Sequence, residues 1–233
     1  MTNEEIFELY KLQSQNVRKL EQVKRNLIKD INFHLRKSDD FQVEIKTKLL
    51  ALLYCAWSEA QFTQIVYTPS AFSQSEISHI KSINTIFGKW EKMINLAIAK
   101  VGSWDKNSDL HNRKKNLHNI ITKYIKEPSE IRNKIAHGQW FYALNSKNTA
   151  ESKELTQKLA NLDSEKLIQQ FEVHKFLGLI IRDLVQSPNK GFHNNYWINL
   201  TALEEYIDKT KNRNIETRKQ ELERKPINQY VSN

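Results

Sequence analysis

Hydrophobic residues recur at steps of three and four positions over most of the chain, and this spacing is typical of helices. The longest pattern runs over residues 3–36 and contains Ile6, Leu9, Leu12, Val17, Leu20, Val23, Leu27, Ile31 and Leu35. Ser38-Asp39-Asp40 interrupts it, and residues of these types cap helix N-termini. The pattern therefore predicts a long N-terminal helix over 3–36 and a second helix that begins near residue 40.

The second predicted helix, over 40–67, contains "KLLALLYCAWSEAQFTQIVY", which is apolar on most sides. We therefore expect it at the centre of a bundle. The remaining predicted helices cover residues 74–101, 109–126, 128–137, 163–186 and about 200–224. After Gly138, the segments "QWFYAL", "NSKN" and "ESKELT" suggest a small β-hairpin, because aromatic residues flank a polar turn.

Five glycines and four prolines are few for a chain of 233 residues, which argues against a loop-rich all-β protein. The expected fold is an all-α helical bundle. We divide it into one helical domain over 1–200, which includes the long helix 3–36, and a charged C-terminal helical arm over 201–233.

The formal net charge of +9 and the isoelectric point near 9.4 favour a polyanionic partner such as RNA, although charge also serves solubility alone. No stretch is apolar enough to span a membrane, and the N-terminus lacks a basic-then-apolar export signal, so we expect a cytoplasmic protein without a membrane partner. Cys55, the single cysteine, excludes an intramolecular disulfide, and no Cys/His cluster suggests zinc. We expect no metal and no cofactor.

Glycine loops that hold nucleotide phosphates are absent from the sequence. His111 and His118 lie two helical turns apart but lack further ligands for a metal. The run Arg113-Lys114-Lys115 is either a patch that contacts RNA phosphates or a solvated helix face. Glu59, within an apolar helix, either supports a functional site or lies at the rim of the bundle.

The segment "EPSEIRNKIAHGQW", residues 127–140, combines unusual residues on one short helix. Pro128 favours the first helical turn, and Gly138 is the usual residue just beyond a last turn. At about 100° per residue, Ile131 and Ile135 form an apolar stripe. Arg132, Asn133 and His137 then share the opposite side, with only Ala136 between them.

Arginine is always cationic and suits phosphate oxygens, whereas histidine exchanges protons near neutral pH. Together they provide what metal-free RNA cleavage needs, which is a base for the 2′-hydroxyl and a cation for the pentavalent transition state. Asn133 would orient His137 or hold a phosphate oxygen, and Lys134 adds a positive charge for RNA. From the residues alone, a capping or salt-bridging role for these side chains remains an alternative.

The sequence "RNKIAHG", residues 132–138, resembles the R-x4-6-H motif of the HEPN superfamily, including the polar residue after Arg and the Gly after His. The resemblance covers roughly residues 40–185, and its specific part lies within 128–142. The segment "LLYCAWSEAQF" is also similar to an early core helix of several members. The residues "HGQWFYALN" differ from the extra motifs of the short HEPN toxins, and the chain looks more like the abortive-infection branch.

The resemblance implies an all-helical, metal-independent endoribonuclease with catalytic Arg132 and His137, which leaves 2′,3′-cyclic phosphate ends. It also implies a homodimer with one composite cleft, and a role as a toxin or abortive-infection effector with a possible antitoxin. Cellular or phage RNA would be the substrate, and some members associate with a structured RNA. The alternative is a catalytically silent RNA- or nucleotide-binding protein within a ribonucleoprotein or regulatory complex.

Overall fold

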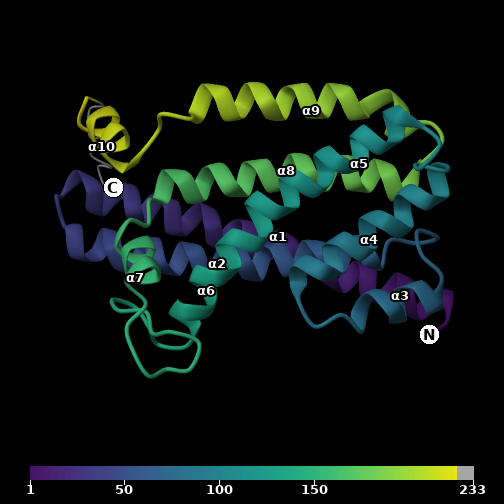
Figure 1. Ribbon diagram of the computed structural model, residues 1–233. Helices are drawn as coiled ribbons and strands as arrows, with labels where there is room; N and C mark the ends of the chain where they lie inside the picture. The colour runs from purple at the N-terminus through teal and green to yellow at the C-terminus, as the bar shows by residue number, and fades with distance from the viewer. Residues whose placement is uncertain (225–233) are drawn as a thin grey trace, which may run out of the picture.

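A computed structural model describes residues 1–224 and shows a bundle of helices, which confirms the predicted all-α fold (Figure 1). The helices are α1 (Asn3–Arg36), α2 (Asp40–Val66), α3 (Gln74–Lys81), α4 (Ile86–Val101), α5 (Ser108–Ile121), the π-helical segment η1 (Thr122–Lys126), α6 (Glu127–Ala136), α7 (Lys153–Ala160), α8 (Ser164–Gln186), α9 (Gly191–Thr210) and α10 (Ile215–Glu223). Within these described residues, no helix has the length and apolar character needed to cross a membrane.

Helices α1 and α2 form a long hairpin whose bounds agree with the sequence prediction. A reciprocal capping box fixes the start of α1: the Glu5 amide donates to Thr2 Oγ1, and the Thr2 amide donates to the Glu5 carboxylate. Asp39 caps α2 by accepting a hydrogen bond from the Gln42 amide. Ser38 makes the turn between the helices with a φ of 51°.

Helix α2 is the central helix, as its apolar sequence predicts, because α1, α4, α6 and α8 all pack against it. Trp57 and Leu50 are buried on its inner side. Gly178 allows α8 to approach α2 closely, since a Cβ at this position would lie 2.5 Å from Gln61 Nε2.

The predicted single helix over 74–101 is wrong, because residues 82–85 separate α3 from α4. Ser82 ends α3, and Thr85 caps α4 by accepting a hydrogen bond from the Gly88 amide. Gly88 is needed in this turn, since a Cβ there would lie 2.9 Å from the Ile83 side chain. The capping hydroxyl therefore restarts the helix in a new direction.

The predicted break before Pro128 is also wrong, because α5, η1 and α6 form one continuous rod that crosses the bundle obliquely (Figure 1). Proline has no amide hydrogen, so in an α-helix the carbonyl of Tyr124, four residues earlier, would lose its donor. The chain adopts π-helix over Thr122–Lys126, and the Tyr54 hydroxyl of α2 donates a hydrogen bond to the Tyr124 carbonyl. This bond joins the rod to the central helix.

The predicted β-hairpin after Gly138 is reduced to one antiparallel bridge, between Leu144 and Glu151, and no strand forms in the described residues. The "ESKELT" segment mostly enters helix α7, because Leu155 and Leu159 are four residues apart and lie on one helical face. Leu159 is buried against the core. A loop over 138–152 therefore replaces the hairpin.

The predicted domain boundary at residue 200 falls inside α9, which begins at Gly191 and packs along α8. Residues 211–214 separate α9 from α10, so the single helix predicted over about 200–224 is wrong. Helix α10 packs against α1 and α8, with Leu222 buried. Residues 225–233 of the predicted arm lie outside the described part.

His174 of α8 lies at the junction of the two hydrophobic clusters of the described core, within 5.9 Å of the ring centroids of Tyr54, Trp57 and Trp90. Burial lowers the pKa of His174 from 6.5 to about 3. The Tyr54 hydroxyl donates its hydrogen bond to the Tyr124 carbonyl, so it can only accept one from His174. The 3.3 Å contact between Tyr54 Oη and His174 Nδ1 therefore assigns the imidazole hydrogen to Nδ1. The core is thus built around a neutral imidazole.

The buried imidazole predicts a loss of stability in mild acid. In the unfolded chain His174 has its ordinary pKa, so the unfolded state binds the extra proton below about pH 6.5 and the folded state does so only near pH 3. The contribution of the neutral imidazole to the free energy of unfolding is fully present above pH 6.5. Below that pH the free energy of unfolding should fall by up to about 1.4 kcal/mol per pH unit. Urea unfolding between pH 7 and pH 4 measures it. An equal slope in His174→Gln would contradict this assignment.

Candidate functional site

Helix α6 presents two contrasting faces, as the residue spacing predicts. Ile131 and Ile135 are buried in the core that α2, α7 and α8 complete. Asn133, Ala136 and His137 are exposed to solvent. The apolar stripe holds the helix in place, and the polar residues of the motif are left on its open side.

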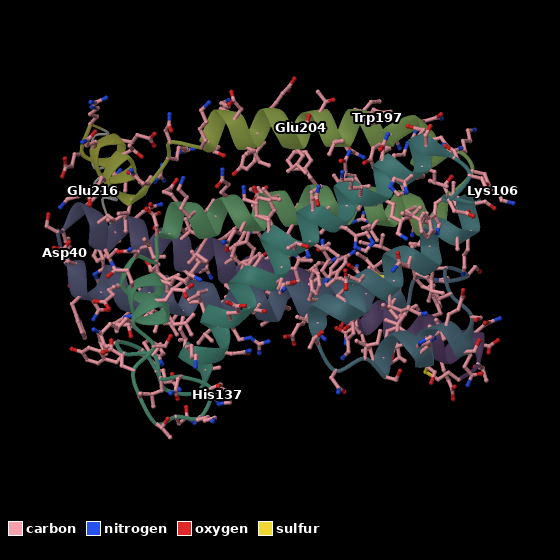
Figure 2. The ribbon with its side chains drawn as sticks, viewed as in Figure 1. Asp40, Lys106, His137, Trp197, Glu204 and Glu216 are labelled. Atoms are coloured by element: carbon pink, nitrogen blue, oxygen red, sulfur yellow. The ribbon has the colours of Figure 1, made fainter. Side chains whose placement is uncertain are left out.

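The end of α6 holds His137 in a defined position. His137 is the C-cap residue, and Gly138 follows with a φ of 79°, which favours glycine. The Gly138 amide donates to the Ile135 carbonyl and the Gln139 amide to the Lys134 carbonyl, which together make a Schellman motif. Figure 2 shows His137 at the lower edge of the molecule, where α6 ends.

Arg132 turns toward α2 and forms an ion pair with Glu59, with 2.9 Å between Nη2 and Oε1. Both side chains are partly exposed, at 30% for Arg132 and 48% for Glu59. Cys55 lies one turn before Glu59, and burial raises the pKa of its thiol to about 12 although Arg132 opposes this shift. Glu59 therefore lies at the rim of the bundle, which is one of the two alternatives from the sequence, and it pairs there with a candidate catalytic residue.

Arg132 and His137 line different pockets within one chain. Arg132 borders a pocket of about 560 Å³ between α2, α3, α4 and α6. His137 borders a second pocket of about 670 Å³, together with the loop over 138–152. Asn133 lines both pockets. Asn133 thus lies between two separate hollows on the open side of α6, one beside Arg132 and one beside His137.

Lys134 has a structural contact that the sequence did not predict. Its Nζ donates a hydrogen bond of 2.5 Å to the Leu144 carbonyl, and this bond ties the loop after Gly138 to α6. Lys134 also borders the pocket of His137. An RNA contact by this lysine would have to share its ammonium group with the loop.

The predicted RNA-contacting run on α5 is corrected at Arg113. This side chain is buried, pairs with Asp109 at 2.7 Å, and lies within 5.5 Å of the ring centroids of three aromatic residues of α9. Arg113 follows the buried spacing of Leu110 and Leu117, and this periodicity could have identified it as a core residue. A buried guanidinium is not available to RNA phosphates.

The two lysines that follow Arg113 differ from it. Lys114 Nζ lies 3.4 Å from the centroid of Trp104, and burial lowers the pKa of this lysine. Lys115 is exposed and stays a candidate RNA contact. The three residues thus do not form one patch.

The two histidines of α5 have ordinary polar and aromatic neighbours. His118 contacts Glu91 and Asn95, each at 3.3 Å, and His111 lies against Trp104. Across residues 1–224, no group of three or more His, Cys, Asp or Glu side chains is arranged to hold a metal ion.

The sequence reasoning missed the cations of the first pocket. Lys81 of α3 and Lys89 of α4 line it together with Arg132. The capping residue Thr85 was the only local signal in this region, and it marks a helix start rather than a pocket. Only the packing of three separate elements brings these side chains together.

The corrected role of Arg113 predicts an effect on stability. Arg113→Ala should lower the free energy of unfolding by about 2–4 kcal/mol, because it removes a buried ion pair and the packing against α9. Lys115→Ala is the control and should change it by less than about 0.5 kcal/mol. Urea unfolding measures both. Equal stability of the two variants would contradict the structural role of Arg113.

Comparison with family models, with curated proteins and with solved structures finds no match to this chain. The function is therefore inferred from the geometry of α6 and of the two pockets beside it.

Proposed function

We propose that the protein is a metal-independent endoribonuclease with Arg132, Asn133 and His137 as its catalytic residues. One observation carries the proposal: α6 is held by a buried isoleucine stripe, while its open side carries an exposed imidazole, an amide and a partly exposed guanidinium. The net charge of +9 supports a polyanionic substrate. The resemblance to the HEPN motif adds the reaction class.

In the proposed reaction His137 accepts the proton of a ribose 2′-hydroxyl. The oxygen attacks the adjacent phosphorus, and the bond from phosphorus to the 5′-oxygen breaks. Arg132 stabilises the negative charge of the pentavalent transition state, and Asn133 holds a phosphate oxygen or orients the imidazole. The His137 imidazole of a second copy of the chain gives a proton to the leaving 5′-oxygen. The products are a 2′,3′-cyclic phosphate and a 5′-hydroxyl.

The separation of the two pockets supports a site shared by two copies of the chain. Within one chain Arg132 and His137 border different hollows, whereas a second α6 across a two-fold axis would bring in another arginine and imidazole. Ala136 is exposed and small, so it lets a second backbone come close. Exposed Phe141 and Tyr142 in the following loop offer apolar area for such an interface.

The Arg132–Glu59 ion pair favours a second candidate function. In the single chain the Glu59 carboxylate neutralises the positive charge of Arg132, which the transition state would need. A substrate phosphate therefore has to displace this carboxylate from Arg132. If it does not, the protein binds RNA or nucleotides without cutting them, within a ribonucleoprotein or regulatory complex.

The biological role follows the reaction in this proposal. A cytoplasmic ribonuclease of this kind would act as a toxin or abortive-infection effector on cellular or phage RNA, under the control of an antitoxin or a bound RNA. These assignments rest on the resemblance of residues 132–138.

Substitution of the two charged residues separates a nuclease from a binder. His137→Ala should slow cleavage about 10²- to 10⁴-fold, because it removes the proton acceptor. Arg132→Ala should slow it about 10²- to 10³-fold by removing charge stabilisation. Neither side chain fills the core, so circular dichroism should be unchanged. Cleavage of labelled total RNA is measured, with analysis of the product ends.

His193→Ala and Arg25→Ala remove exposed residues of the same types elsewhere and serve as controls with full activity. EDTA should leave the rate unchanged, since the proposed steps need no metal. The ribonuclease proposal fails if the wild-type protein cuts no cellular RNA, if EDTA abolishes cleavage, or if His137→Ala keeps the wild-type rate.

The composite site predicts a homodimer through the exposed face of α6. Light scattering at tens of micromolar should give twice the mass of the chain. Ala136→Arg should yield a folded monomer with little cleavage, because it places a bulky cation where two cationic faces already meet. Ala99→Arg, on an exposed position of α4, is the control and should remain dimeric. A strictly monomeric wild-type protein would contradict the shared site.

A further inference from the structure

The pocket beside Arg132 has walls from four helices and a floor from the core. Helix α2 contributes Glu59 and Thr63, α3 contributes Lys81, the turn before α4 contributes Asn84, and α6 contributes Asn133. Its volume of about 560 Å³ is within the range of small-ligand sites and is large enough for one nucleotide. This pocket has no role in the catalytic proposal beyond its contact with Arg132 and Asn133.

The charged side chains of this pocket favour an anion. Lys81, Lys89 and Arg132 line it against one carboxylate, that of Glu59, which leaves a formal charge of 3 − 1 = +2. Lys89 is half-buried and forms no ion pair within residues 1–224. Lys81 Nζ donates a 2.9 Å hydrogen bond to the Tyr67 hydroxyl, which holds the ammonium group at the wall of the pocket.

The start of α4 adds to the positive electrostatic potential of this pocket. Thr85 and Ile86, at the N-terminus of this 16-residue helix, both line the pocket. Thr85 Oγ1 already accepts the Gly88 amide, while the amides of the first turn carry the positive end of the helix dipole. Three cations and a helix N-terminus therefore converge on one hollow.

We propose that this pocket binds a backbone phosphate of single-stranded RNA together with its nucleotide, adjacent to the bond that is cut. The inference rests on the proposed ribonuclease function, and it specifies the substrate class. Asn133 lines both this pocket and that of His137, so a strand held by its phosphate at Lys89 continues over Asn133 to the imidazole. A stacked duplex presents no separate nucleotide to such a hollow, whereas a single strand does.

Binding of a fluorescent single-stranded oligouridylate tests the pocket, in the His137→Ala protein so that the probe stays intact. The double variant Lys81→Gln/Lys89→Gln should weaken binding about tenfold per lysine, because each substitution removes a charged hydrogen-bond donor. The slope of log affinity against log salt should decrease by about 0.7, because one phosphate contact is lost. Glu59→Gln should act in the opposite direction and tighten binding, because it removes the one carboxylate that residues 1–224 place in the pocket.

The double variant Lys29→Gln/Lys106→Gln removes the same number of charges from exposed positions outside the pocket. Figure 2 shows Lys106 at the right edge of the molecule, away from His137. Equal binding by the pocket variant and this control would overturn the inference, even if the wild-type protein cleaves RNA. It would also fall if uridine monophosphate alone bound as tightly as the oligouridylate, since the pocket would then hold free nucleotides. Weaker binding by the pocket variant alone would support the RNA site in this pocket. If the wild-type protein then cuts no RNA, the ribonuclease proposal fails and the binding site stands.

Discussion

The hydrogen bond from the Tyr54 hydroxyl to the Tyr124 carbonyl fixes the arrangement on which the candidate site depends. Pro128 has no amide hydrogen to donate to this carbonyl, and a buried carbonyl without a partner would destabilise the fold. The tyrosine supplies the missing donor from the central helix. The rod of α5, η1 and α6 can therefore continue through the proline. It is anchored to α2 at Tyr124, within the π-helical segment and four residues before Pro128.

This anchor determines which neighbours the motif residues of α6 meet. Because α6 follows the rod onto α2, Arg132 lies over Glu59 and Cys55, while His137 extends beyond the bundle to the loop over 138–152. The same crossing leaves a hollow between α6, α3 and the start of α4, where the lysines gather. The charge at the site is thus a balance between one carboxylate and cations from three elements.

Much of the helical pattern could be predicted from the spacing of apolar residues, because each helix buries one face. The bounds of α1 and α2 follow from this spacing and from the capping residues Thr2 and Asp39. The hairpin was predicted from the aromatic residues near Gly138. The four-residue spacing of Leu155 and Leu159, which indicates a helix, was given too little weight. The basic run at 113–115 was misread for a similar reason, since its charge concealed that Arg113 continues the buried spacing of α5.

The sequence by itself determined the all-α fold, the central position of α2 and the two faces of α6, because these depend on the local periodicity of side chains along one helix. It also identified Arg132, Asn133 and His137 as neighbours on the open side of that helix. Only the tertiary structure decided that Arg132 pairs with Glu59, that Asn133 lies between two pockets, and that Lys81 and Lys89 join one of them. Those contacts depend on how distant helices cross, and a crossing is set by packing and by partners such as Tyr54 that no local pattern specifies.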